Sequence, residues 1–151
     1  MCESPVPGKR EIPLGVKLKF IHLAFDNRFN QNLQELNLTS SQMHLLCYLD
    51  ECERNGKKVN QRDIEKHLHL SNPTVTGLLQ RLEAKGFVAR RISERDGRNK
   101  VISQTEACRA IHAEMRRRLD SQNAEIVRGL SPEEIAELNR LLDVLLKNIQ
   151  E

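Results

Sequence analysis

One stretch, residues 60–105, constrains the fold of this chain more than any other. Two helical patterns meet there at a short turn, and the second ends at Gly86, a residue suited to the left-handed position that follows a helix. An arginine-rich segment comes next, between two runs of strand-forming residues. The second helical pattern repeats apolar residues at three- and four-residue steps, at Val75, Leu78, Leu79 and Leu82. This order predicts a helix-turn-helix followed by a wing.

The two helices of this stretch have clear starting signals. Asn60 can cap the first helix, which ends in a turn at residues 69–70. Ser71 or Asn72 caps the second helix, and Pro73 falls in its first turn, where its missing N–H costs nothing.

The wing is expected as a hairpin. Strand-forming residues occupy 87–92 and 100–103, and the polar loop between them, residues 94–99, contains an Asp-Gly turn pair. This loop is longer than a minimal hairpin turn and should project.

Helical patterns also precede this stretch. The first begins at Pro13 and is expected to break near Asn30. The second opens with a capping box at Thr39 and Gln42 and ends before Asn55. Its expected apolar positions are Met43, Leu46, Cys47 and Leu49.

Two further helices follow the wing. Thr105 caps the first of them, and Gly129 stops it after about residue 128. Its apolar stripe is expected to be Ala107, Ile111, Met115, Leu119 and Ile126. Residues 131–134 combine a cap, a proline and a glutamate at the start of the last helix. That helix carries a seam for another helix at Ile135, Leu138, Leu142, Leu145 and Ile149.

Composition excludes several classes of protein. The 151 residues suffice for a core without disulfides or metals, and aromatic residues are only 3%, so the core must be aliphatic. We expect a cytoplasmic protein, because neither a membrane-spanning run nor a secretory signal is present, and four reduced cysteines. The net charge is +3, and residues 60–100 alone hold nine Lys/Arg against five Asp/Glu. Such a local excess fits a phosphate-binding surface as well as an ordinary solvated one.

Three segments carry a resemblance to a known family. They are L-T-S-S-Q-M-H-L-L-C-Y-L (residues 38–49), S-N-P-T-V-T-G-L-L-Q-R-L-E-A-K-G-F-V-A-R (71–90) and D-G-R-N-K (96–100). In this order they resemble the second helix, the recognition helix with the first wing strand, and the wing signature of the MarR family of bacterial winged-helix regulators. The resemblance covers residues 14–149. Gln104 departs from it, at a position where the family usually has leucine.

The resemblance implies a mainly α (α+β) fold and one MarR-type domain. A winged helix-turn-helix at residues 39–104 would lie between an N-terminal dimerisation helix at 13–38 and C-terminal dimerisation helices at 105–151. Residues 1–12 read as a flexible tail. The implied function is that of a sequence-specific transcriptional regulator, a homodimeric repressor on a pseudo-palindromic double-stranded DNA operator.

Polar residues of the recognition helix could read bases. Short side chains near the start of such a helix reach base edges in the major groove, and Thr74 and Thr76 are expected to do so. Ser71 and Asn72 are available too, but we expect them mainly to cap the helix. Longer side chains further along are suited to bases or phosphates, and these are Gln80 and Arg81.

The wing offers a second set of contacts. The resemblance implies that Arg98 enters the minor groove, where negative potential favours it, and Asp96 could hold its guanidinium. An exposed pair of this kind would otherwise add almost nothing to stability. The remaining basic residues of the wing, expected at phosphates, are Arg90, Arg91, Arg95 and Lys100.

The family also implies a pocket for an effector. A small aromatic or anionic molecule bound there would release the protein from DNA. The candidate lining residues are His22, Asp26, His44, Tyr48 and His112, each of which could equally be an ordinary packed or surface residue. Cys108 and His112 have metal-ligand spacing, but the basic run at 116–118 disfavours a cation, so no metal and no cofactor are expected. A peroxide-sensing cysteine is missing from the first helix.

No catalytic arrangement is present: the chain has no G-x-S-x-G, phosphate loop or H-E-x-x-H motif, and we expect no enzyme. The alternative is a winged helix used as a protein-interaction module, with its basic wing on an acidic partner.

Overall fold

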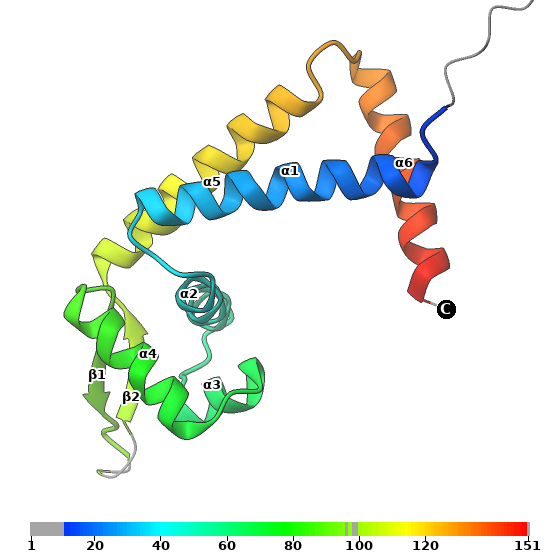
Figure 1. Ribbon diagram of the computed structural model, residues 1–151. Helices are drawn as coiled ribbons and strands as arrows, with labels where there is room; N and C mark the ends of the chain where they lie inside the picture. Colours follow the sequence, from blue (N-terminus) through cyan, green and yellow to red (C-terminus); the bar gives the residue numbers. More distant parts are fainter. Residues whose placement is uncertain (1–10, 96, 98–99, 151) are drawn as a thin grey trace, which may run out of the picture. The chain divides into compact units, whose positions relative to one another are not determined.

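The computed structural model describes residues 11–95, 97 and 100–150, and the chain divides into two compact units, Met1–Ile111 and His112–Glu151 (Figure 1). Along the chain the elements are α1 (Leu14–Glu35), α2 (Ser40–Arg54), α3 (Gln61–Leu68), α4 (Asn72–Ala84), β1 (Val88–Ile92), β2 (Lys100–Gln104), α5 (Glu106–Ile126) and α6 (Pro132–Gln150). None of these helices is long and apolar enough to cross a bilayer. The mainly α fold class is confirmed.

Local capping signals start α2 and α3 as expected. The Thr39 hydroxyl accepts from the N–H of Gln42, and the Gln42 side chain accepts from the N–H of Thr39. Asn60 and Asp63 make the same reciprocal pair at the start of α3, each bond 3.0 Å long. Because these pairs satisfy N–H groups that have no partner inside the helix, both starts are fixed locally.

The core of the first unit lies between α2, α3, α4 and the hairpin. Its fully buried side chains include Leu45, Leu46, Leu49, Ile64, Val75, Leu79 and Leu82. β1 pairs with β2 in antiparallel register, with Arg90 opposite Ile102, and Val59 adds an isolated bridge to Ile102. Gly86 ends α4 with a φ of +76°, where a side chain would be strained. Figure 1 shows the resulting order of helix, turn, helix and hairpin, a winged helix-turn-helix.

Two expectations about α1 and α2 are wrong. α1 runs unbroken through Asn30, since a single asparagine costs a helix only about 0.5 kcal/mol and no Gly or Pro follows Gly15 within the helix. On α2, Cys47 is exposed, although its thiol was expected to be buried. The buried face of α2 is centred on Leu45 and Leu49 instead, and Cys47 lies on the opposite side of the helix.

The apolar stripe of α5 also differs from expectation. Thr105 caps the helix by accepting from the N–H of Cys108 at 3.3 Å, as predicted. Cys108 is fully buried while Ala107 is exposed, so the inward face begins one residue later. At the other end Ile126 is 47% exposed.

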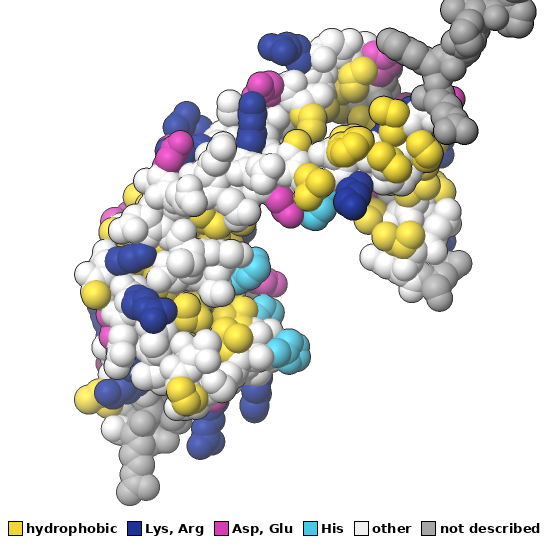
Figure 2. All heavy atoms as spheres, viewed as in Figure 1, with side chains coloured by type: hydrophobic (Ala, Val, Ile, Leu, Met, Phe, Trp, Pro, Cys, Tyr) yellow, Lys and Arg dark blue, Asp and Glu magenta, His cyan; other side chains and the backbone are white. Residues whose placement is uncertain are grey.

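In the second unit, α6 begins with the predicted capping box: Ser131 and Glu134 exchange bonds of 2.8 and 3.2 Å. None of its side chains is buried. Ile135, Leu142 and Leu145 are half-buried, and the seam residues Leu138 and Ile149 are 40% and 79% exposed. α1, described by itself, likewise carries exposed large apolar side chains at Leu14, Val16, Leu18, Phe20, Ile21 and Leu23. Figure 2 shows hydrophobic side chains at the surface over these helices.

Candidate nucleic-acid interface

α4 presents a polar face to solvent because its apolar residues all point inward. Val75, Leu78, Leu79 and Leu82 are buried, as predicted. Thr74, Gln80 and Arg81 are exposed, and Thr76 is half-buried at the edge of this face. Gly77 lies next to Thr76 and adds no side chain. The outward face of α4 is therefore polar, basic at one end and bare in its middle.

The first turn of α4 is held by side chains rather than capped by them. Ser71 occupies the N-cap position, as one of the two predicted alternatives, but its side chain makes no capping hydrogen bond. The Ser71 and Thr74 hydroxyls lie 2.8 Å apart, and the Asn72 amide donates to Glu65 of α3 at 2.7 Å. These contacts order the polar side chains at the start of α4, where a ligand could meet them.

A second bond joins the two helices further along. The Gln61 amide nitrogen lies 2.8 Å from the Thr76 hydroxyl oxygen and 3.4 Å from the backbone oxygen of Asn72. Gln61 is the first residue of α3, so the start of one helix fixes a side chain in the middle of the other.

The basic residues of the hairpin differ in how free they are. Arg90 places its Nε 2.7 Å from a carboxylate oxygen of Glu83 on α4, and its side chain is only 21% exposed. Arg91, Arg95 and Lys100 are exposed. Asp96 and Arg98 lie outside the described residues. The salt bridge of Arg90 ties the hairpin to α4, which leaves Arg91 as the more available cation on β1.

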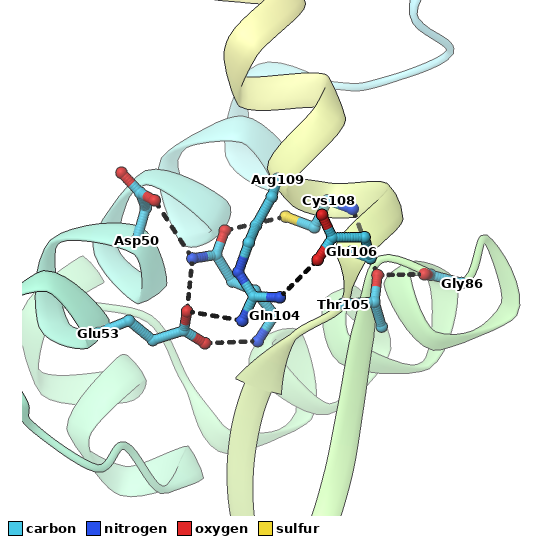
Figure 3. A network of polar contacts seen from close by, with 8 residues as sticks. All are labelled: Asp50, Glu53, Gly86, Gln104, Thr105, Glu106, Cys108 and Arg109. Atoms are coloured by element: carbon cyan, nitrogen blue, oxygen red, sulfur yellow. Dashed lines mark hydrogen bonds and ion pairs between the residues drawn. The ribbon is translucent and has the colours of Figure 1, made fainter.

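A polar network at the base of the wing was missed from sequence (Figure 3). Gln104 is buried at 5% exposure, and its side-chain amide donates to Asp50 at 3.3 Å and to Glu53 at 3.2 Å, both on α2. Its backbone N–H also donates to Glu53, at 2.9 Å. Its side-chain oxygen accepts from the Cys108 thiol at 3.1 Å.

The network continues to the surface and to the end of α4. Arg109 bonds Glu53 and Glu106 at 3.3 and 3.2 Å. Thr105 donates its hydroxyl to the backbone oxygen of Gly86 at 2.6 Å. These bonds join α2, the end of β2 and the start of α5, so they fix the point from which the wing projects (Figure 3). The only sequence signal was the polar Gln104 where the resembled family has leucine.

The expected effector residues differ in their exposure and in their partners. His22 and Asp26 of α1 pair with each other at 3.2 Å, and both are exposed. Tyr48 of α2 is buried and stacks on His67 of α3, with ring centroids 3.9 Å apart. His44 is exposed, and His112, on α5, belongs to the second unit.

Burial raises the pKa of two side chains near this region, Tyr48 and Cys108. Burial, with smaller contributions from Cys52, raises the pKa of Tyr48 to about 12. Burial and the nearby carboxylates of Asp50 and Glu53 raise the pKa of Cys108 to about 12. A thiol with so high a pKa is a poor nucleophile. Within the described residues, no three His, Cys, Asp or Glu side chains are grouped so as to hold a metal ion.

Comparison with known proteins matches this region to one family. Residues 38–100 match the family model described as the MarR family. Among solved structures, a mutant of Staphylococcus aureus MepR bound to an oligodeoxyribonucleotide is similar, with 28% identity and a TM-score of 0.78 over 92% of this chain and 99% of that one. MepR without this mutation, a transcription regulator of the multidrug efflux pump MepA, matches with 25% identity and a TM-score of 0.80 over 91% and 99%. MepR bound to ethidium bromide matches with 26% identity and a TM-score of 0.72 over 93% and 99%.

Proposed function

We propose that this chain, whose residues 38–100 match the MarR family model, is a DNA-binding transcription regulator that acts as a homodimeric, sequence-specific repressor whose DNA binding a small-molecule effector relieves. The observation that carries the DNA-binding part is the face of α4, where exposed Thr74, Gln80 and Arg81 lie over a fully buried apolar face. A helix of this kind can enter the major groove without uncovering its core.

The roles within the interface follow from exposure and partners. Thr74, Thr76 and Gln80 face base edges, while Arg81 and Arg91 neutralise phosphates. Ser71 and Asn72, whose side chains make no capping bond, join the end of α4 that meets the bases. Arg90 positions the wing through Glu83 and contributes less charge to the DNA. Arg95 and Lys100 extend the phosphate contacts, and Arg98 beside Asp96 enters the minor groove, as the resemblance implies.

The homodimer rests on the exposed apolar side chains of α1 and α6. Leu14, Phe20 and Ile21 are 48–59% exposed, and five apolar side chains of α6 are 40–79% exposed. A second copy of the chain would remove these side chains from water, each for roughly 1.5–3 kcal/mol when fully buried. Two copies related by a twofold axis would place their α4 helices in successive major grooves about 34 Å apart, on a pseudo-palindromic operator.

Effector relief is supported by the likeness to MepR, whose structure with ethidium bromide shows that protein holding a planar aromatic molecule. We propose an aromatic effector for this chain, with His22, Asp26, His44 and Tyr48 of the first unit as the candidate contacts. An aromatic compound that does not itself bind DNA should then lower the affinity of the protein for its operator. Failure of every member of a broad aromatic panel would remove the effector from the proposal and leave the DNA binding intact.

The experiment that tests the DNA-binding function is selection of duplex fragments by the purified protein, followed by titration at several salt concentrations. We expect one pseudo-palindromic motif and an affinity that falls steeply with salt. Arg91→Ala should weaken binding to all duplexes alike and reduce the salt slope by about 1, because one phosphate contact is lost. Arg116→Ala, which removes an exposed charge from α5, is the matched control. Enrichment of no sequence, together with tight binding to an acidic protein, would favour the protein-interaction module instead.

A further inference from the structure

The Thr76 hydroxyl is held in one orientation by another helix. The Gln61 side chain lies 2.8 Å from Thr76 Oγ1 and 3.4 Å from the backbone oxygen of Asn72. A backbone carbonyl oxygen can only accept a hydrogen bond, so the Gln61 atom beside it is the amide nitrogen. The same nitrogen therefore donates to Thr76, and Thr76 Oγ1 acts as the acceptor in this contact.

This direction decides what Thr76 can offer to a ligand. A threonine hydroxyl has one proton to donate, and Gln61 occupies an accepting lone pair. The hydroxyl proton is then left for a partner outside the pair. Thr76 is half-buried at the edge of the polar face of α4. A Cβ at its neighbour Gly77 would meet no described atom within 4 Å apart from its chain neighbours and the backbone of α4 itself. A ligand can therefore approach the hydroxyl across the bare position.

We propose that Gln61 is a positioning residue for base recognition, which sets Thr76 as a hydrogen-bond donor toward the major groove. This inference rests on the proposed DNA-binding function. A donor selects base pairs that present an acceptor at that point: guanine N7 or O6, adenine N7, or thymine O4. It disfavours an edge whose nearest group is the amino group of cytosine. Without Gln61 a threonine would read either kind of group, because its hydroxyl rotates freely.

Three substitutions at these two positions give graded outcomes. Gln61→Ala frees the hydroxyl, so the preference at one base pair of each half-site relaxes. Gln61→Glu turns the contact round, because a carboxylate accepts the hydroxyl proton, so Thr76 then presents its oxygen and favours a base that offers an amino group. Thr76→Val keeps the shape and removes the hydroxyl, so the preference there falls roughly five-fold, the effect of one hydrogen bond.

The fold should tolerate the glutamate. Residue 61 is the first residue of α3, where a negative side chain interacts favourably with the helix dipole. The added charge would nevertheless repel DNA, so a matched control is needed. Lys66→Gln changes the charge of α3 by the same amount at an exposed position, and it should lower the affinity for all duplexes without changing the base preference.

The experiment is selection and sequencing of bound duplexes with the full-length wild type and these four variants, with circular dichroism to check each fold. The expected result is an acceptor-bearing base pair for the wild type, a relaxed preference for Gln61→Ala and a reversed one for Gln61→Glu. If Thr76→Val and the Gln61 variants select the same motif as the wild type, the inference is overturned while the DNA-binding function stands. If the wild type selects no motif, the proposed function fails, and this inference fails with it. A Gln61→Glu variant that does not fold leaves the decision to Gln61→Ala and Thr76→Val.

Discussion

Two helices of this protein, α4 and α6, both carry an apolar face, but the face of α4 is buried and that of α6 is exposed. All four inward residues of α4, Val75, Leu78, Leu79 and Leu82, are at most 6% exposed, because α2, α3 and the hairpin cover them. α6 has no buried residue, and five of its Leu, Val and Ile side chains are 40–79% exposed. The first helix is completed by its own chain. The second has an exposed apolar surface, which a second copy of the chain would cover in the proposed dimer.

The strongest test of this comparison is to place charge on the uncovered surface. Leu138→Glu combined with Leu141→Glu should dissociate the dimer, because both side chains are exposed in the single chain. DNA affinity should fall by about 100-fold or more, since a monomer loses the gain from binding two half-sites at once. Sedimentation and DNA titration measure the two effects.

Ala136→Glu combined with Lys147→Gln is the matched control for this pair, because it changes the charge of α6 by the same two units on its polar side. It should leave the dimer and the DNA affinity unchanged. A double variant that stays dimeric with full DNA affinity would show that the exposed side chains of α6 have no such role.

The first unit, Met1–Ile111, depends for its stability on the polar network around Gln104. Gln104→Leu removes the amide that donates to Asp50 and Glu53 and leaves both carboxylates at the edge of an apolar site. Both carboxylates keep some contact with water, at 20% and 32% side-chain exposure, so we expect a loss of about 2 kcal/mol in the free energy of unfolding. Denaturant titration measures it.

Gln80→Leu is the control for this substitution, since it makes the same change at an exposed site on α4 and should alter stability by less than about 0.5 kcal/mol. A Gln104→Leu variant as stable as the wild type would mean that the network contributes position and not stability.

The sequence could predict features that depend on neighbouring residues, but not those that depend on distant ones. The capping boxes at Thr39 and Ser131 and the glycine after α4 were correct, because each depends on residues three or four apart. Gln104 could not be interpreted, because its partners lie 51 and 54 residues away. Cys47 was misplaced because apolar residues occur on more than one side of α2, and only tertiary packing decides which side is buried.

The candidate interface was predictable in composition but not in arrangement. The sequence indicated which polar residues share the outward face of α4. It could not show that Arg90 is engaged by Glu83 or that Thr76 is held by Gln61, since those contacts require the packing of two elements.

The smallest effect we predict concerns how tightly the first unit excludes water around Cys108. In the unfolded chain this thiol has an ordinary pKa near 9.0, and in the folded protein burial and the charges of Asp50 and Glu53 raise the pKa to about 12. Below pH 9 the thiol keeps its proton in both states and adds no pH dependence. Between pH 9 and 12 the unfolded state releases a proton that the folded state retains, so stability falls as the pH rises. At pH 10 the loss should be about 1 kcal/mol.

Comparison of the wild type with Cys108→Ala isolates this contribution, because all other groups titrate in both proteins. Denaturant titrations at pH 8 and pH 10 should show that the wild type loses more stability than the variant between the two values. Alkylation gives a second measure: Cys108 should resist iodoacetamide at pH 8 until the protein is unfolded, since its thiolate is scarce and its side chain is fully buried. Equal pH dependence of the two proteins, together with rapid native alkylation of Cys108, would mean that water reaches the thiol. The core of the first unit would then admit water, and its contrast with the exposed apolar face of α6 would be weaker than we propose.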